Sequence, residues 1–246
     1  MASYTTVPNK DLKIHNCKMK CDDKLAEGIP PPLPSHSFCM CVVGVPGSGK
    51  TVFINSLVGA KRRKGIPQGY KKVFNHVIIC SPSRSTLTND IYRDLDENKK
   101  HDEFNNEFLD FLTEFTDGTS AEQETTLCIL DDVASQLKKS QAIQRRLAYL
   151  IQNRRHRYLS FMISVQYYKN VPLPIRSALS HLVLFRPANK KELDHVSDEL
   201  LPIPKSQVND LIAFIYDAKH NFMFVDMSLR VSNKYEFFKN FDRIVF

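Results

Sequence analysis

The feature that most constrains this chain is a glycine-rich run, Gly44-Val45-Pro46-Gly47-Ser48-Gly49-Lys50-Thr51, which fits the pattern G-x-x-x-x-G-K-[ST]. An apolar run of strand type precedes it at residues 38–43, and residues 52–58 indicate the opening of a helix. In this context, backbone N–H groups and a helix N-terminus surround phosphate oxygens. Lys50 supplies a positive charge to the β- and γ-phosphates, and Thr51 supplies a hydroxyl to Mg²⁺. We therefore expect the chain to bind ATP and Mg²⁺.

A second apolar strand, predicted over residues 125–130, ends in Asp131 and Asp132. After a complete phosphate loop, a strand that ends in acidic residues is typical of the second half of a phosphate-loop NTPase. We expect Asp131 to hold Mg²⁺, directly or through water, and Asp132 to polarise the attacking water. A further buried strand is predicted over residues 159–165, and Gln166 follows it as a candidate γ-phosphate sensor or water-orienting side chain.

Strand and helix patterns alternate along the chain, which predicts an α/β fold with a mainly parallel central sheet flanked by helices. Other strands are predicted at residues 73–80, 181–185 and 221–226, and helices at 51–60, 86–117 (in two pieces), 136–153, 189–200 and 205–216. A strand inserted between the phosphate-loop strand and the acidic strand would give the additional-strand type of P-loop NTPase. The sequence alone does not fix that strand order.

The chain is predicted to have three parts. Residues 1–36 are a polar N-terminal arm with a Pro-rich end, where four prolines within positions 30–34 favour an extended polyproline conformation. Residues 37–230 form the P-loop ATPase domain. Residues 231–246 are aromatic and basic, and are expected to extend the same domain over an edge or a subunit contact.

The composition is that of a globular protein with a basic balance. The 246 residues carry 34 Lys+Arg against 27 Asp+Glu, a net charge of +7, which favours a polyanionic partner but also fits a protein that is merely basic. No apolar run approaches the ~20 residues of a membrane span, so a soluble protein is expected. Among the six cysteines, Cys39, Cys41, Cys80 and Cys128 lie in strand-like runs and are expected to be buried free thiols.

The order of these motifs resembles the genome-packaging ATPases of the FtsK–HerA superfamily, which are found in large DNA viruses, virophages and related mobile elements. The resemblance covers roughly residues 37–230. Its specific part is the run Asn153-Arg154-Arg155-His156-Arg157-Tyr158-Leu159-Ser160, together with Val165-Gln166 and Ile175-Arg176. On local sequence alone, the basic run would be read as a solvated turn.

The resemblance implies an ATP-driven motor that threads double-stranded DNA into a preformed capsid. It implies a homo-oligomeric ring, of five or six subunits, with capsid proteins as further partners. Its place of action would be the host-cell cytoplasm or a viral factory, or the virion itself.

The resemblance also assigns roles to individual residues. Lys50 and Thr51 match the phosphate and Mg²⁺ positions, and Gln166 matches the sensor. Asp131 and Asp132 match the acidic pair, although many relatives have Asp-Glu there, so Asp132 is a shorter catalytic carboxylate. The candidates for an arginine that reaches into the neighbour's site, or senses the nucleotide, are Arg155, the adjacent Arg154 and Arg176.

Two other functions remain open from the sequence. A P-loop nucleotide kinase would require an Arg-rich lid and an acceptor pocket, and no clear lid is seen. A nucleotide-binding assembly factor without motor activity would not need the intact Lys50, Thr51 and Asp131. A GTPase would require Asn-Lys-x-Asp, whereas Asn189-Lys190-Lys191-Glu192 has glutamate at the deciding position.

Overall fold

The computed structural model describes residues 24–61, 68–82, 91–201, 203–228 and 235–245. Their strands form one nine-stranded sheet in the order β3-β2-β4-β5-β1-β6-β7-β8-β9. The strands are β1 (Cys39–Val43), β2 (His76–Cys80), β3 (Lys100–His101), β4 (Thr126–Leu130), β5 (Leu159–Val165), β6 (His181–Phe185), β7 (Phe222–Asp226), β8 (Glu236–Lys239) and β9 (Asp242–Arg243). The six strands from β3 to β6 in this order are parallel, and β7, β8 and β9 continue the sheet in antiparallel pairings.

Strand β5 lies between β1, which leads into the phosphate loop, and β4, which ends before the acidic pair. The predicted α/β fold of the additional-strand type is therefore confirmed. The parallel register pairs Val43 with Val165 and Leu130 with Ile163. Since parallel strands end at the same edge, the segments that follow β1, β4 and β5 meet there.

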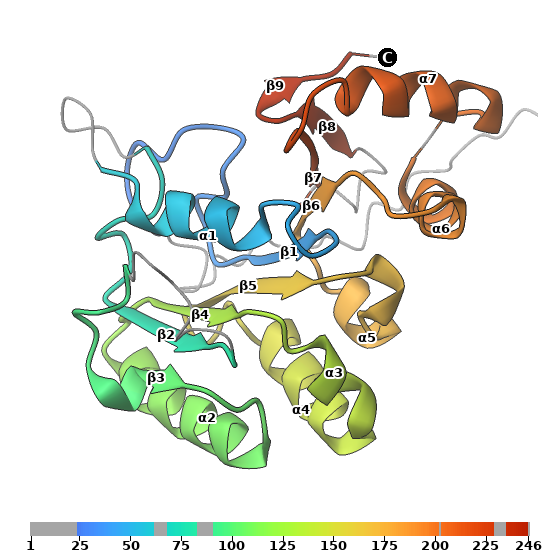
Figure 1. Cartoon of the computed structure of the whole chain (residues 1–246). Helices are drawn as coiled ribbons and strands as arrows, with labels where there is room; N and C mark the ends of the chain where they lie inside the picture. The colour runs from blue at the N-terminus through green and yellow to red at the C-terminus, as the bar shows by residue number, and fades with distance from the viewer. Residues whose placement is uncertain (1–23, 62–67, 83–90, 202, 229–234, 246) are drawn as a thin grey trace, which may run out of the picture.

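Helices cover both faces of the sheet (Figure 1). They are α1 (Lys50–Gly59), α2 (Asn106–Ala121), α3 (Ala134–Lys139), α4 (Gln141–Gln152), α5 (Leu173–Arg176), α6 (Lys190–Leu200) and α7 (Lys205–Ile215), with 3₁₀ turns η3 (Glu97–Lys99) and η4 (Tyr168–Asn170). Helix α1 packs on one face, whereas α2, α3 and α4 pack on the other.

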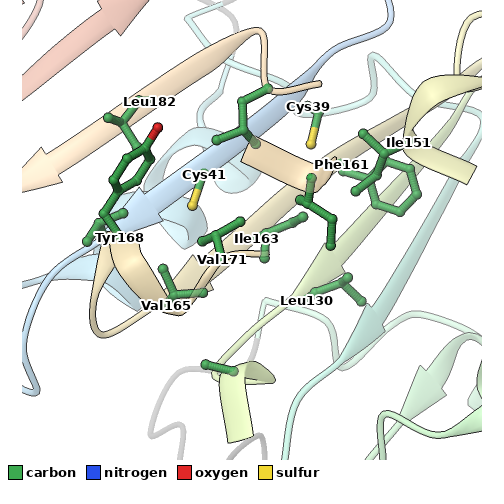
Figure 2. Close-up of a cluster of buried hydrophobic side chains, with 14 of the residues drawn as sticks. Cys39, Cys41, Leu130, Ile151, Phe161, Ile163, Val165, Tyr168, Val171 and Leu182 are labelled. Atoms are coloured by element: carbon green, nitrogen blue, oxygen red, sulfur yellow. The ribbon is translucent and has the colours of Figure 1, made fainter. Parts of the chain in front are cut away.

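Every residue of β1, β4, β5 and β6 is buried, because both faces of these strands are covered. Alternate residues of β1 enter different clusters: Cys39 and Cys41 join the larger one, while Met40 and Val42 pack with α1. Figure 2 shows the larger cluster, in which the two β1 cysteines lie among apolar side chains of neighbouring strands. The prediction of buried free thiols is confirmed for the four cysteines in strands.

Three predictions of helical structure differ from the structure. The single helix expected over residues 136–153 is two helices, because Ser140 ends α3 and its hydroxyl accepts a hydrogen bond from the N–H of Ile143 at the start of α4. Two helical pieces are predicted over residues 86–117. Where the first of them is expected, the described residues form η3 and β3 instead. Helix α2 continues to Ala121, beyond the expected end at 117, because Gly118 fits within the helix without breaking it.

The proline-rich segment is not an extended polyproline helix. The N–H of Leu33 donates to the carbonyl of Pro30 (3.0 Å) and closes a turn. Ile29 and Leu33 are buried against the α1 side of the sheet, and the Tyr70 hydroxyl donates to the carbonyl of Pro34 (2.9 Å). The burial of Ile29 and Leu33 and this hydrogen bond outweigh the local preference of proline for the extended polyproline conformation. Residues 1–23 of the predicted arm, and most of the basic run 61–64, lie outside the described residues.

The last described strands lie at one edge of the sheet. Strands β8 and β9 form an antiparallel pair at the margin of the sheet, and β8 pairs with β7. Within the described residues, no helix combines the length and the apolar character that crossing a membrane would require.

Candidate active site

The phosphate loop connects β1 to α1 in a backbone conformation that its glycines permit. Gly47 and Gly49 have φ of +76° and +112°, a region that side chains with a Cβ rarely adopt. At Gly44 an added Cβ would lie 2.5 Å from Ser48 Oγ and 2.8 Å from Phe185 Cβ, so this position admits only glycine without rearrangement. No side chain caps the N-terminus of the ten-residue helix α1. Its first N–H groups are therefore available to an anion.

Lys50 lies folded over this loop. Its Nζ donates to the carbonyl oxygens of Gly44 (2.6 Å) and Val45 (3.1 Å). Burial lowers the pKa of the half-buried ammonium, and the nearby carboxylates of Asp132 and Asp131 partly offset that effect. The ammonium is thus held inside the loop, where it can exchange carbonyl oxygens for phosphate oxygens.

Thr51 and Asp131 meet across the sheet edge. Thr51 Oγ1 donates to Asp131 Oδ2 at 3.4 Å, and Asp131 is only 7% exposed. Within the described residues, no group of three or more carboxylate, imidazole or thiol side chains is arranged to hold a metal ion. A hydroxyl and one carboxylate fit Mg²⁺, which prefers oxygen ligands and usually takes the remaining ones from water and substrate phosphates.

Asp132 and Gln166 also lie together. The amide Nε2 of Gln166 is 3.4 Å from Asp132 Oδ1. Asp132 is exposed and has φ of +55°, which turns it away from the strand that precedes it. The predicted Lys50, Thr51, Asp131, Asp132 and Gln166 therefore all lie around the carboxyl ends of β1, β4 and β5.

Ser164 is a site residue that the sequence reasoning missed. Its buried hydroxyl donates a very short hydrogen bond to Asp131 Oδ1 and accepts one from the N–H of Asp132 at 3.0 Å. A single side chain of β5 thus contacts both acidic residues. A signal was present in the sequence, because Ser164 is a polar residue within an apolar strand and lies two positions before Gln166, on the same face.

Arg154 and Arg155 lie at the opposite edge of the sheet. They precede β5, whereas Gln166 follows it, and seven strand residues span about 20 Å. Arg154 Nη1 donates to the carbonyl of Ile151 (3.0 Å), and both arginines line a cavity of about 760 Å³ beside His181. The structure therefore does not bring them to the phosphate loop of the same chain.

Arg176 is engaged within its own chain. Its guanidinium lies 3.1 Å from Glu199 Oε2 and 5.2 Å from the centre of the Tyr168 ring, and its side chain is 15% exposed. The Tyr168 hydroxyl donates to Glu199 Oε1 (2.9 Å), which closes the cluster.

Asn189, the first residue of the GTPase-like run, caps α6 by accepting from the N–H of Glu192 (3.0 Å).

The sequence matches a known family over most of its length. A family profile described as "Poxvirus A32 protein" matches residues 31–236. None of the curated proteins searched matches the chain.

Solved structures share the fold. The genome packaging NTPase B204 from Sulfolobus turreted icosahedral virus 2, in complex with ATP-gammaS, has 15% identity and a TM-score of 0.55, over 83% of this chain and 98% of that chain. Its complex with AMP has 17% identity and a TM-score of 0.53, over 82% and 97%. The cytoplasmic domain of the type VII secretion ATPase EccC from Thermomonospora curvata has 14% identity and a TM-score of 0.51, over 82% of this chain and 25% of that chain. The family match and these structures confirm the resemblance to viral packaging ATPases that the motifs indicated.

Proposed function

Because the chain belongs to the Poxvirus A32 protein family, we propose that it is an ATP-hydrolysing motor that translocates double-stranded DNA into a viral capsid. One observation carries the proposal: Lys50, the Thr51–Asp131 pair and the Asp132–Gln166 pair converge at one sheet edge. The fold shared with a viral protein described as a genome packaging NTPase supports the same conclusion. Its place of action would be the host-cell cytoplasm, a viral factory or the virion.

The geometry supports the following division of roles. The loop N–H groups and Lys50 would bind the phosphates, and Thr51 and Asp131 would hold Mg²⁺, which would supply positive charge against the developing negative charge. Asp132, exposed at the same edge, polarises the attacking water. Gln166 orients the Asp132 carboxylate through its amide and is placed to respond to the γ-phosphate. Hydrolysis of ATP to ADP and phosphate would follow from positioning and charge stabilisation.

A ring of five or six subunits would complete this site. Arg155 is exposed at the edge of the sheet away from its own phosphate loop, so it is suited to serve a neighbouring subunit. An arginine supplied in trans contributes about 10³–10⁵ in rate to phosphoryl transfer. Arg154 is an alternative, whereas Arg176 would first have to leave Glu199. Basic loops of the ring would bind DNA phosphates in a salt-dependent, sequence-independent way.

Subunit mixing tests the site and the ring together. Lys50→Ala is expected to abolish ATP turnover, because the loop loses its mobile cation. Arg155→Ala is also expected to be inactive, but mixing it with Lys50→Ala should restore turnover, since each subunit supplies what the other lacks. Arg157→Ala is the matched control, because Arg157 is bound to Asp117 (2.5 Å) in its own chain. Absence of restored activity at every mixing ratio would refute a trans role for Arg155.

Translocation requires its own assay. ATP-dependent displacement of a third strand from double-stranded DNA is expected for the wild type and not for Lys50→Ala. ATP turnover without displacement would favour a nucleotide-binding assembly factor. Transfer of the γ-phosphate to an acceptor other than water would favour a nucleotide kinase.

A further inference from the structure

Gln166 lies between two fixed points of the backbone. On one side, the N–H of Gly44 donates to the carbonyl of Val165 (3.1 Å), which ties the end of β5 to the phosphate loop. On the other side, the N–H of Tyr168, the first residue of η4, donates to the carboxylate oxygen Oε1 of Glu192. Gln166 and one further residue lie between these points. The direction in which the Gln166 side chain points therefore depends on where Glu192 holds the chain.

Glu192 is a buried carboxylate in the first turn of α6, and it is only 6% exposed. Acidic side chains are almost never fully buried without a polar partner. Here the partner is the backbone of η4, which packs on α6. Asn189 fixes the start of the helix by accepting from the N–H of Glu192 (3.0 Å). The GTPase-like run thus has a place in this fold, because its asparagine caps α6 and its glutamate holds the segment after Gln166.

Helix α6 holds Tyr168 at both ends. Glu199 lies on the same face of α6 as Glu192, about two turns further along, and accepts from the Tyr168 hydroxyl (2.9 Å). Between these two contacts the Tyr168 ring is fully buried in the larger apolar cluster (Figure 2). Tyr168 therefore cannot shift along the helix without breaking a buried hydrogen bond, which is costly.

Building on the proposed function, we infer that Glu192 is a positioning residue, which acts through Tyr168 to hold Gln166 against Asp132 and toward the γ-phosphate. Gln166 Nε2 is 3.4 Å from Asp132 Oδ1, at the long end of the hydrogen-bond range, so a small shift of the chain breaks this contact. Without Glu192, the N–H of Tyr168 loses its acceptor, and Gln166 is free to turn away from Asp132.

Binding of nucleotides with and without a γ-phosphate tests the inference without turnover. The probes are β,γ-methylene-ATP, which is not hydrolysed, and ADP, each with Mg²⁺, measured by calorimetry on the full chain. Glu192→Leu removes the acceptor and keeps the size of the side chain. We expect it to weaken binding of β,γ-methylene-ATP about tenfold and to leave ADP binding within about twofold of wild type. An equal loss for both probes, or no loss for either, would overturn the positioning role.

Three further variants separate the bond to the backbone from charge and packing, and the ratio of the two affinities is the readout. Glu192→Gln keeps an acceptor oxygen and should keep the wild-type ratio. Glu192→Asp keeps the charge but shortens the side chain, so it should lower the ratio, and it carries the test if Glu192→Leu does not fold. Tyr168→Phe is the matched control, because it loses the bond to Glu199 and keeps the backbone bond to Glu192. A loss in Tyr168→Phe equal to that in Glu192→Leu would overturn the role of the backbone bond.

A double-mutant cycle shows whether Glu192 acts through Gln166. Gln166→Ala should itself lower the ratio, and adding Glu192→Leu should lower it no further, because the positioned side chain is already gone. A further loss would overturn the inference and leave Gln166 as the sensor. A wild-type ratio in Gln166→Ala would overturn the proposed role of Gln166 and the inference with it. A wild-type chain that prefers β,γ-methylene-ATP but does not hydrolyse ATP would refute the motor and leave the role of Glu192 intact.

Discussion

Ser164→Ala removes a hydroxyl that contacts both acidic residues of the candidate site. In the variant, Asp131 Oδ1 loses a hydrogen bond, and the N–H of Asp132 loses its acceptor. Asp131 is then free to rotate away from Thr51, and the left-handed backbone at Asp132 loses its support. The loop itself, including the Lys50 contacts, is not altered.

The magnitude follows from the two lost bonds. A hydrogen bond to a charged group contributes about 1.5–3 kcal/mol, and an ordinary one about 0.5–1.5 kcal/mol. Suppose that about 1.4–2.7 kcal/mol of this hydrogen-bond energy stabilises the transition state by keeping the carboxylates oriented. Its loss then lowers kcat about ten- to hundredfold. The Mg²⁺ concentration needed for half-maximal activity should rise, because Asp131 is less well held. Mg²⁺-free nucleotide binding should change little.

Ser160→Ala is the matched control for this prediction. Ser160 lies on the same buried strand, and its hydroxyl accepts from the N–H of Phe38 (3.2 Å) at the edge away from the acidic pair. Both variants should stay folded in chemical denaturation, and Ser164→Ala should lose more stability because it loses the bond to a charged carboxylate as well. Steady-state ATP turnover at several Mg²⁺ concentrations then separates them. Equal kcat and equal Mg²⁺ dependence in the two variants would refute the positioning role of Ser164.

Three further predictions concern the loop, a buried histidine and the thiols. Gly49→Ala should lose ATP binding in calorimetry while staying folded by circular dichroism, because φ of +112° strains any residue with a Cβ. Burial, aided by Arg154 and opposed by Asp226, lowers the pKa of His181 below its usual 6.5. Below that pH the unfolded chain takes up a proton that the folded chain does not, so the free energy of unfolding should fall by up to about 1.4 kcal/mol per pH unit, and less so in His181→Gln. Burial raises the pKa of the Cys39 thiol to about 12, so peptide mapping after alkylation at pH 8 should find it unmodified in the native protein and modified after unfolding.

The central sheet could be predicted because its strands are buried on both faces. Such strands are continuous apolar runs, and the predictions for residues 159–165 and 181–185 match β5 and β6 at both ends. The ends of helices are harder to predict than these strands, because a single side chain can decide where a helix ends. Ser140 splits a helix through its hydroxyl, and Gly118 fails to end one.

In the candidate site, too, a local sequence pattern predicts some residues and not others. The phosphate loop is one contiguous pattern, so its residues follow from the sequence. Ser164 contacts Asp131, a partner 33 positions away, so this contact depends on strand register. The guanidinium of Arg176 lies against Glu199, another partner that no local pattern indicates.

The most direct test is ATP turnover by the purified chain with Mg²⁺, with and without double-stranded DNA, alongside its oligomeric mass. We expect a ring-sized oligomer whose turnover rises on addition of double-stranded DNA, and Lys50→Ala of the same mass without turnover. A monomer whose turnover does not respond to DNA, or a Lys50→Ala variant as active as the wild type, would contradict the assignment of this site to a DNA-packaging motor.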